Sequence, residues 1–448
     1  KVIVGDLDCI VDEIKEDTGK VDVEALMTDI LPTLDIIKYY EDNGKEILGT
    51  EKRKTPKFFR NNSSYVEYKP LGVVVIISPW NFPLQLSMVP AITALIAGNT
   101  VLLKPSEVTP VVGKLAEEIC EAASIPDNVL QVLQGSGDVG EKLIKSDPDK
   151  IFFTGSVETG KKIMKSASKN LVPLELEMGG KDPMIVFKDS NFDRSVEAAV
   201  YGAFANSGQL CVSVERLYVQ DEIYEEFLDA VLERTKKLRV GEGKNSDLGP
   251  MIYPQQIKTV EDHLEDALNK GADVLTEIKK ENLFFYPQIL KDVDHTMKIM
   301  KEETFGPLLP IMPFKNEEEV IKLANDTKYG LNSSVWSNDI KKAKRVVSKL
   351  DVGNSYINDV FKNIGNPHLP FGGAKKSGMG MYHGPEGLKR FSQRTSVMIN
   401  KNKGMEPNWF PYSEELYETL KKLIYTDYGT IGYLEKIKNY IDLYRRIR

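Results

Sequence analysis

The feature that most restricts the fold of this chain is an alternation of short apolar runs with longer helix-like segments, which begins at Leu71. Residues 73–77 form a continuous β-branched run, as expected of a parallel strand buried on both faces. Residues 83–97 follow as a predicted helix. Further strands are predicted at 100–103, 129–133 and 150–153, and a further helix at 111–123. This alternation predicts βαβ units, and therefore an α/β protein with a doubly wound parallel sheet.

A second α/β block begins near Gly180 and extends to about Gly380. Its clearest signals are strands at 184–187 and 217–219 and an amphipathic helix at 223–238. At about 150 residues per domain, a chain of 448 residues holds two or three domains. The chain opens at Lys1 as if inside a structured element, so we expect further residues to precede it.

The first fifty residues are predicted to be helical. Within residues 21–40, apolar side chains at spacings of three and four predict one buried helix face. This face consists of Val23, Leu26, Ile30, Leu34 and Ile37. Residues 52–70 differ, because their charged side chains and the alternating stretch 65–68 are typical of an exposed strand or arm.

Two further helices are predicted after Asn400, where the composition changes again. Ser413 is suited to cap the first of them. Its apolar stripe is Leu416, Leu420 and Leu423, and that of the second helix, residues 433–448, is Leu434, Ile437, Ile441 and Tyr444. The second helix can be interpreted as an ordinary docked helix, or as one that contacts a membrane surface or a partner protein.

Charge and cysteine content exclude several classes of function. A net charge of −7 and a pI near 5.5 provide no basic surface for nucleic acid. Three scattered cysteines argue against a disulfide framework and for a reducing, cytoplasmic location. No CxxC pair occurs and the four histidines are scattered, so we expect no metal site. We find no secretory signal and no apolar stretch long enough to span a bilayer.

Cys211 is the best candidate for a nucleophile. A lone cysteine is more often an inert core residue, and Cys9 and Cys120 lie on helical patterns that favour this interpretation. Cys211 instead follows the polar, turn-prone stretch 206–209, which suits an exposed position. Because the thiolate is the reactive form, its pKa would have to fall from about 8.5 to between about 3.5 and 7.5.

Two polar side chains are suited to assist this thiol. Glu177 ends a predicted strand directly before a pair of glycines, and a carboxylate at the mouth of a site predicts a general base. Its neighbour Glu175 is expected to be a solvated surface residue. Asn81 follows the first predicted strand, where ligands bind in doubly wound sheets, and could donate its amide to a developing oxyanion. The alternative for Asn81 is a turn residue bonded to its own backbone.

Two glycine motifs compete for the phosphates of a dinucleotide. Residues 135–140 match GxGxxG after a strand, and residues 155–160 also follow a strand and open a helix whose free N–H groups suit an anion. These residues alone leave the choice open. Lys104 and Glu107, after the second predicted strand, can both bond ribose hydroxyls. Glu107 would repel a 2′-phosphate and so favours NAD over NADP, although a solvated loop is the alternative.

Four strings in this order resemble the aldehyde dehydrogenase superfamily, over a match from about Val11 to Lys401. They are Pro79-Trp80-Asn81-Phe82, Phe153-Thr154-Gly155-Ser156, Glu177-Met178-Gly179-Gly180-Lys181 and Gly208-Gln209-Leu210-Cys211. The resemblance implies that Cys211 is the nucleophile, Glu177 the general base, and Asn81 with the Cys211 N–H the oxyanion hole. The cofactor-binding residues that it implies are Trp80, Lys104, Glu107, Gly155, Ser156, Glu303 and Phe305. It also implies that the helix after Ser156 faces the pyrophosphate, and that 135–140 is a tight turn without a phosphate.

The same resemblance implies oxidation of a small-molecule aldehyde to its acid through a cysteine thiohemiacetal and thioester, with NAD, or else NADP, as cofactor. Relatives that acylate CoA lack the base, so Glu177 favours hydrolysis. The implied domains are a cofactor domain (1–51 and 71–178), a catalytic domain (179–390), an oligomerisation arm (52–70 and 391–403) and a helical tail (404–448). Because such arms pair across subunits, we expect a homodimer or homotetramer.

The substrate branch stays open. Residues 370–373, residues 382–384 and the long tail resemble members that oxidise fatty or aromatic aldehydes, whereas residues 208–216 resemble succinate-semialdehyde members. Apolar residues near the predicted site favour an apolar aldehyde; they are Phe82, Leu86, Leu210 and Val212. The chain departs from the common pattern at Val89-Pro90, where many members have a lysine, and in 378–381, where methionine replaces a frequent arginine. Two other classes are an inactive binding protein with a dehydrogenase fold and a cysteine hydrolase that needs no cofactor.

Overall fold

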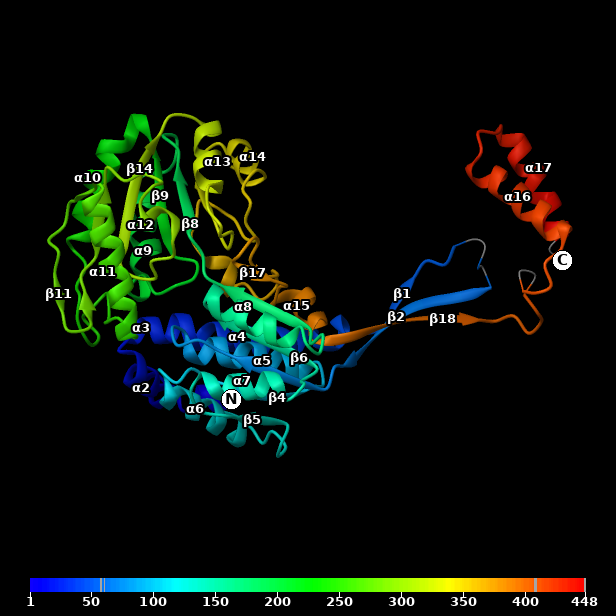
Figure 1. Ribbon diagram of the computed structural model, residues 1–448, viewed down its shortest axis with the longest axis horizontal. Coiled ribbons are helices and arrows are strands. Elements are labelled where there is room, and N and C mark those ends of the chain that lie inside the picture. Colours follow the sequence, from blue (N-terminus) through cyan, green and yellow to red (C-terminus); the bar gives the residue numbers. More distant parts are fainter. Residues whose placement is uncertain (57–58, 60, 407–408, 447–448) are drawn as a thin grey trace. The chain divides into compact units, whose positions relative to one another are not determined.

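The computed structural model describes residues 1–56, 59, 61–406 and 409–446 (Figure 1). The chain forms two compact units. The first consists of Lys1–Gly49 with Tyr68–Gln393, and the second of Thr50–Glu67 with Arg394–Arg448. The first unit contains both predicted α/β blocks, which confirms the predicted fold class.

The first block is built on a six-stranded sheet. Its strands are β3 (Val73–Ile77), β4 (Thr100–Lys104), β5 (Leu130–Val132), β6 (Lys150–Gly155), β7 (Leu174–Met178) and β17 (Gly378–Met379). They lie in the order β17-β7-β6-β3-β4-β5, and all neighbours are parallel except β17 and β7. The strands predicted from the β-branched runs are confirmed. Since the chain runs outward from β3 and then returns to β6, the order reverses between these two strands, where doubly wound sheets bind ligands.

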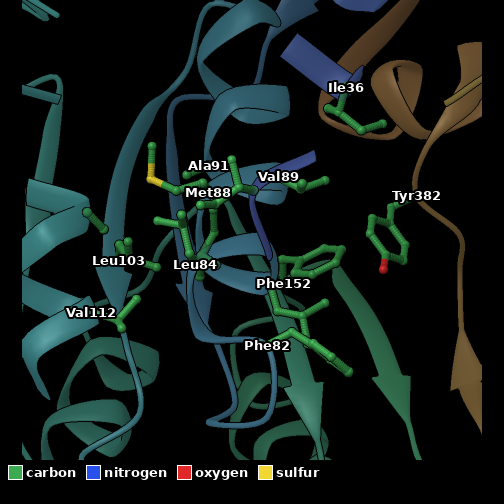
Figure 2. Packing of buried hydrophobic residues seen from close by; sticks show 14 of the residues in the cluster. Ile36, Phe82, Leu84, Met88, Val89, Ala91, Leu103, Val112, Phe152 and Tyr382 are labelled. Carbon is green, nitrogen blue, oxygen red and sulfur yellow. The ribbon is translucent and has the colours of Figure 1, made fainter. Parts of the chain in front are cut away.

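Helices cover both faces of this sheet. They are α5 (Pro83–Ile96), α6 (Pro110–Ala122), α7 (Gly137–Lys145) and α8 (Val157–Ala167). Val74 and Ile76 of β3 pack with α5 and α6, whereas Val75 packs with α7 and α8. Because successive side chains of a strand point to opposite faces, the two helix pairs lie on opposite sides. Figure 2 shows the first side, where apolar residues of α5 gather near Leu103 of β4 and Val112 of α6.

The second block is a seven-stranded sheet. Its strands are β8 (Asp182–Val186), β9 (Val214–Gln220), β10 (Asp273–Val274), β13 (Gln288–Lys291), β14 (Leu308–Phe314), β15 (Ser334–Trp336) and β16 (Tyr356–Ile357). They follow the order β10-β13-β14-β9-β8-β15-β16, and β11 (Lys280–Glu281) pairs separately with β12 (Phe284–Phe285). The accompanying helices are α9 (Phe192–Phe204), α10 (Tyr224–Thr235), α11 (Pro254–Asn269), α12 (Lys298–Lys301), α13 (Glu317–Asn325) and α14 (Ile340–Val347), with short 3₁₀ turns η3 (Ala205–Gly208), η4 (Asp221–Ile223) and η5 (Lys362–Gly365). Helix α15 (Gly384–Arg390) returns to the first block, where Leu388 packs in the core that contains α5.

The N-terminal residues are helical, as predicted, but the predicted apolar face is correct only from Ile30 onward, where Leu34 and Ile37 pack against the core. The elements are α1 (Val2–Gly5), α2 (Leu7–Thr18), α3 (Asp22–Glu24), the π-helix η1 (Ala25–Ile30) and α4 (Leu31–Ile47). Val23 and Leu26 are exposed, whereas Ala25, Ile30 and Ile36 are buried. The π-helix changes the angular step between residues, so a face counted at ordinary α-helical spacing does not continue through it.

The second unit contains a three-stranded sheet and two helices. The elements are β1 (Glu51–Arg53), β2 (Asn62–Pro70), β18 (Ser392–Asn400), α16 (Glu414–Tyr428) and α17 (Tyr433–Arg446). The sheet order is β1-β2-β18. Ser413 caps α16 as predicted, since its hydroxyl accepts a hydrogen bond from Leu416 N–H. Residues 447 and 448 of the predicted second helix lie outside the described residues. Among the helices of the described chain, none has the length and hydropathy that crossing a membrane requires.

Candidate active site

A cavity of about 900 Å³ lies at the carboxyl ends of β3, β4, β6 and β7, where the sheet order reverses. Every residue that the sequence singled out for catalysis or cofactor binding lines it. These residues are Trp80, Asn81, Lys104, Glu107, Gly155, Ser156, Glu177, Cys211, Glu303 and Phe305. The structure therefore brings together side chains that are far apart in the sequence, at the edge where ligands bind in such sheets.

Cys211 reaches this cavity from a strained turn. It follows η3, in which Asn206 and Ser207 adopt left-handed backbone angles (φ 51° and 55°) that cost non-glycine residues about 1–3 kcal/mol each. The Cys211 side chain is half-buried. Burial raises the pKa of its thiol, and nearby carboxylates, Glu303 first, raise it further. This shift is opposite to the one that a thiolate nucleophile requires, so a nearby base must accept the thiol proton when the reaction begins.

Glu177 is near the end of β7 and is the candidate for that base. Its side chain is buried, and neither carboxylate oxygen has a hydrogen-bond partner among the described residues. Burial raises the pKa of Glu177 well above its usual range, and Glu175 adds to the shift. A buried carboxyl with both oxygens unpaired is costly. It is therefore suited to exchange protons with a group that enters the cavity.

The expectation that Glu175 is a solvated surface residue is wrong. The residue is 2% exposed and forms an ion pair with Lys150 (Nζ–Oε1 2.9 Å). Its other oxygen, Oε2, accepts a hydrogen bond from the backbone N–H of Met381 (3.0 Å). Glu175 and Glu177 lie on the same face of β7, and a segment about two hundred residues later covers that face, with Tyr382 beside Phe152 (ring centroids 5.4 Å apart; Figure 2).

Asn81 does not simply satisfy its own turn. Its side-chain Nδ2 donates to the backbone carbonyl of Gln209 (3.0 Å), two residues before the cysteine. An amide NH₂ group has two hydrogens, so the second remains able to donate. The side chain is 3% exposed and lines the cavity with Cys211. Asn81 is therefore held beside the thiol by a bond that links the two loops.

Gly179 and Gly180 allow three chain segments to approach one another. A Cβ added to Gly179 would lie 2.0 Å from a carboxylate oxygen of Glu303, and one added to Gly180 would lie 2.6 Å from the carbonyl oxygen of Cys211. Glu303 accepts a hydrogen bond from Gly180 N–H (3.0 Å). Burial raises the pKa of Glu303 to about 8. The glycine pair thus places the Glu303 carboxyl and the Cys211 loop on either side of the end of β7.

The sequence reasoning missed a buried ion pair, Lys181–Glu215, that supports this arrangement. Lys181 is 0% and Glu215 6% exposed at the side chain. The Glu215 carboxylate also accepts hydrogen bonds from the backbone N–H groups of Thr304 and Phe305 (2.9 Å each). Phe305 has a φ of 51°, so this carboxylate fixes a strained segment. The available signal was spacing, because Lys181 and Glu215 each come four residues after a candidate, Glu177 and Cys211 respectively.

The opposite end of the cavity fits a dinucleotide. Lys104 Nζ donates to Glu107 (2.9 Å), and both line the cavity beside the end of β4. Ser156 is the N-cap of α8 and accepts from Thr159 N–H (3.2 Å), so the first turn of this helix faces the cavity with further N–H groups. At the Cys211 end, Trp80 and Phe305 stack edge to face with ring centroids 5.5 Å apart.

Both glycine motifs contribute to this cavity. The motif at 135–140 ends in the first turn of α7, and Gly137, Gly140 and Glu141 line the cavity together with Gly155 and Ser156. The prediction that it forms a tight turn agrees with the φ of 143° at Gly135. It is nevertheless part of the cavity wall. Within the described parts of the chain, no group of three or more metal-ligating side chains is found.

A model of the aldehyde dehydrogenase family matches residues 2–397. The chain belongs to the aldehyde dehydrogenase family. As a member, it is an NAD(P)-dependent enzyme that oxidises an aldehyde, and the predicted enzyme class and cofactor are confirmed.

Similar members of the family have different substrates in their names. A protein named 4,4′-diapolycopene aldehyde oxidase, from Methylomonas sp, is 47% identical over 97% of this chain and 83% of its own length. Betaine aldehyde dehydrogenase of Bacillus subtilis (strain 168) is 37% identical over 88% of this chain and 81% of its own. A crystal structure of betaine aldehyde dehydrogenase from Staphylococcus aureus in complex with NAD⁺ has a TM-score of 0.84 and 33% identity, and covers 92% of this chain and 82% of that chain.

Proposed function

We propose that this member oxidises an apolar aldehyde to the carboxylic acid, with Cys211 as nucleophile, Glu177 as general base and Asn81 as oxyanion donor. The observation that carries the proposal is the meeting of these three residues in one cavity with Lys104 and Glu107. A nicotinamide dinucleotide bound there supplies the acceptor for the hydride that leaves the substrate.

The chain's own residues perform the remaining steps. Glu177 accepts the proton of the Cys211 thiol, and the sulfur attacks the carbonyl carbon to form a thiohemiacetal. Its oxyanion is stabilised by Asn81 Nδ2 and by the backbone N–H of Cys211. After hydride loss the acyl group remains on sulfur as a thioester, and Glu177 gives the thiol proton up to solvent. Glu177 then removes a proton from the water that attacks the thioester, the acid is released, and that proton returns to the departing Cys211 thiolate. Covalent catalysis thereby divides one difficult reaction into two easier ones.

Glu177→Gln and Cys211→Ala test these roles. We expect C211A to form no reduced cofactor. E177Q should form about one equivalent per site at a reduced rate and then stop, because its thioester cannot be hydrolysed. Continuous turnover by E177Q that is as fast as that of the wild type would refute Glu177 as the base for hydrolysis. Release of the thioester on addition of CoA but not in water would identify an acyl-transferring enzyme instead.

An apolar substrate is supported by the cavity wall around Cys211. The cavity-lining residues outside the phosphate and ribose region include Leu86, Leu331, Phe371 and Tyr382. Its two lysines, Lys104 and Lys162, belong to β4 and α8 on the cofactor side. The 47% identical relative named for a diapolycopene aldehyde supports the same class.

Succinate semialdehyde is the second candidate, because residues 208–216 resemble the enzymes that oxidise it. A carboxylated substrate needs a cation near the thiol, and Arg216 is the nearest arginine in the sequence. Its guanidinium is instead buried and donates to the backbone carbonyls of Lys181, Leu323 and Ala324. We therefore expect higher kcat/KM for long aliphatic or aromatic aldehydes than for succinate semialdehyde. The reverse order would favour the second candidate.

Two further measurements distinguish the proposed reaction from an inactive binding protein and from a cysteine hydrolase. An inactive binding protein would form no reduced nicotinamide with long aliphatic aldehydes, aromatic aldehydes or succinate semialdehyde, in the wild type as in C211A. A cysteine hydrolase would release product without NAD or NADP. The absorbance of the reduced cofactor distinguishes both from the proposed reaction.

We also propose the division into a cofactor domain (1–51 and 71–178), a catalytic domain (179–390), an arm (52–70 and 391–403) and a tail (404–448). Strands β1 and β18 are the outer strands of their sheet, and such edges are suited to pair with another subunit. We expect a homodimer or homotetramer by light scattering, and a monomer at micromolar concentration would contradict this. Deleting residues 407–448 should change assembly or substrate range more than NAD affinity. A reducing, cytoplasmic location completes the proposal, because Cys211 must remain a free thiol.

A further inference from the structure

A buried side chain, Asn206, connects the loop that carries Asn81 with the loop that carries Cys211. Its amide Nδ2 donates to the backbone carbonyls of Asn81 (3.4 Å) and Gln209 (3.3 Å). Asn81 Nδ2 donates to the same Gln209 carbonyl (3.0 Å). The backbone carbonyl of Asn206 in turn accepts a hydrogen bond from the side-chain Nε2 of Gln209 (2.8 Å). The separation of the proposed oxyanion donor and the thiol therefore depends on where Asn206 lies.

Asn206 is itself held by a carboxylate from the N-terminal helices. Glu24, the last residue of α3, accepts a hydrogen bond from Asn206 N–H (2.5 Å). Its second oxygen, Oε2, is buried and has no partner among the described residues. Burial raises the pKa of Glu24 to about 7, although the Asn206 N–H and Lys20 oppose the shift. The Glu24 carboxyl is thus a shielded acid, and the one hydrogen bond that it forms with a described residue goes to the Cys211 loop.

The same helical segment also holds the Asn81 loop. Lys20 and Asp29 form an ion pair (Nζ–Oδ2 2.6 Å) with side chains 1% and 0% exposed. The other Asp29 oxygen accepts from two backbone N–H groups in the first turn of α5 (3.1 and 3.3 Å). Lys20 Nζ lies 4.1 Å from the ring centroid of Phe82, the residue that follows Asn81. Residues 20–29 therefore contact both loops of the site, Asp29 on one and Glu24 on the other.

We propose that Glu24 is a positioning residue of the aldehyde-oxidising reaction, which through Asn206 fixes the separation of Asn81 and the Cys211 thiol. The proposal rests on the functions proposed above for Asn81 and Cys211. Glu24 is not among the residues that line the cavity. Its removal should therefore lower the rate of the chemical step and leave the binding of NAD intact.

Glu24→Ala and Glu24→Gln test the proposal together. E24A removes the acceptor for Asn206 N–H, and because a misplacement of about 1 Å can cost about 10²-fold, we expect kcat to fall about 10- to 100-fold. The KM for NAD should change less than about threefold. E24Q keeps an oxygen at the same place, so its kcat should stay within about threefold of the wild type. The single-turnover rate of reduced-cofactor formation should follow the same order.

Asp17→Ala is the matched control. Asp17 is also a half-buried N-terminal carboxylate that accepts a backbone N–H, from Val112 at 2.8 Å, but that bond does not reach the site loops. D17A should lower the melting temperature and leave kcat within about twofold. A similar fall in kcat in D17A and E24A would mean general destabilisation and would overturn the proposal. So would a folded E24A with the kcat of the wild type.

Asn206→Gly keeps the inference testable if E24A does not fold. Glycine accepts the left-handed backbone of this position and retains the N–H that Glu24 binds, but it removes the amide that joins the two loops. We expect the same loss of kcat, and an unchanged kcat would overturn the proposal. C211A distinguishes a failure of the proposed function from a failure of the positioning proposal. If C211A still forms reduced cofactor, the proposed function is refuted. If C211A forms none but N206G is fully active, only the positioning proposal is refuted.

Discussion

Replacing Gly180 with alanine should displace the loop that carries Cys211, the proposed nucleophile. The added Cβ would lie 2.6 Å from the carbonyl oxygen of Cys211 and 2.6 Å from Oδ1 of Asp182. Ordinary van der Waals contact begins at 3.4 Å, so the two segments must separate by about 0.8 Å. The obstacle on the Cys211 side is backbone, which cannot rotate away as the end of a flexible side chain can.

That displacement can be converted into a rate. A misplacement of about 1 Å can cost about 10²-fold, so a shift somewhat below this should lower kcat about 10- to 50-fold. This corresponds to about 1.4–2.3 kcal/mol of additional activation free energy. The Gly180 N–H donates to Glu303 (3.0 Å), and alanine retains this donor, so the KM for NAD should change much less.

Steady-state and single-turnover formation of reduced cofactor measure the effect, with thermal melting as a check on folding. Gly5→Ala is the control, since no atom lies within 4 Å of the Cβ it would add. We expect G5A to have the kcat of the wild type. A well-folded G180A with kcat within about twofold of the wild type would refute the reasoning, because the position of the Cys211 backbone would then not limit the reaction.

Three further variants test other contacts. Glu107→Gln removes the carboxylate that would repel a 2′-phosphate, so the ratio of kcat/KM for NADP to that for NAD should rise about tenfold; an unchanged ratio would contradict a ribose contact. Lys20→Met leaves Asp29 buried and uncompensated and should cost about 3–5 kcal/mol of unfolding free energy in urea. The exposed pair Lys38–Asp42 is its control, and K38M should cost less than about 1 kcal/mol of unfolding free energy. Equal losses of unfolding free energy in K20M and K38M would contradict a larger contribution from the buried pair. Burial lowers the pKa of His263 to about 4. The ordinary pKa of histidine is about 6.5, so between pH 6.5 and about 4 His263 is protonated in the unfolded chain but not in the folded one. The unfolding free energy of the wild type therefore falls as the pH drops through this range. His263→Gln should lose less stability between pH 7 and pH 5, and an equal loss would show that His263 does not titrate in this way.

The local sequence pattern was sufficient to predict the strands of the sheet that forms the cavity. The run at 73–77 was recognisable as a buried parallel strand because both of its faces are covered by helices, which leaves no polar position. The motif at 177–181 and the loop before Cys211 were recognisable because close approach of backbone requires glycine at fixed positions. Predictions of this kind depend on neighbours a few residues away.

The errors came from contacts between distant segments. Glu175 was expected in solvent because a glutamate on an alternating strand usually faces water. Its face is instead covered by residues near Met381, whose N–H it accepts, and its charge is balanced by Lys150 on the adjacent strand. The first part of the N-terminal face, Val23 and Leu26, was wrong for a related reason, since the π-helix between Ala25 and Ile30 is part of a segment whose polar residues bind other loops.

The buried charges of the site follow one rule. Lys181 follows Glu177 by four positions, and Glu215 follows Cys211 by four positions. The ion pair Lys181–Glu215 therefore spans 34 residues, as Glu177 and Cys211 do. The charges of Lys181 and Glu215 are balanced by each other and by backbone N–H groups, and the pair links the two chain segments. Glu177, by contrast, has no partner among the described residues. Balanced charges thus fix the geometry, and the Glu177 carboxyl, with neither oxygen paired among the described residues, lies in the cavity where the proposed reaction moves a proton.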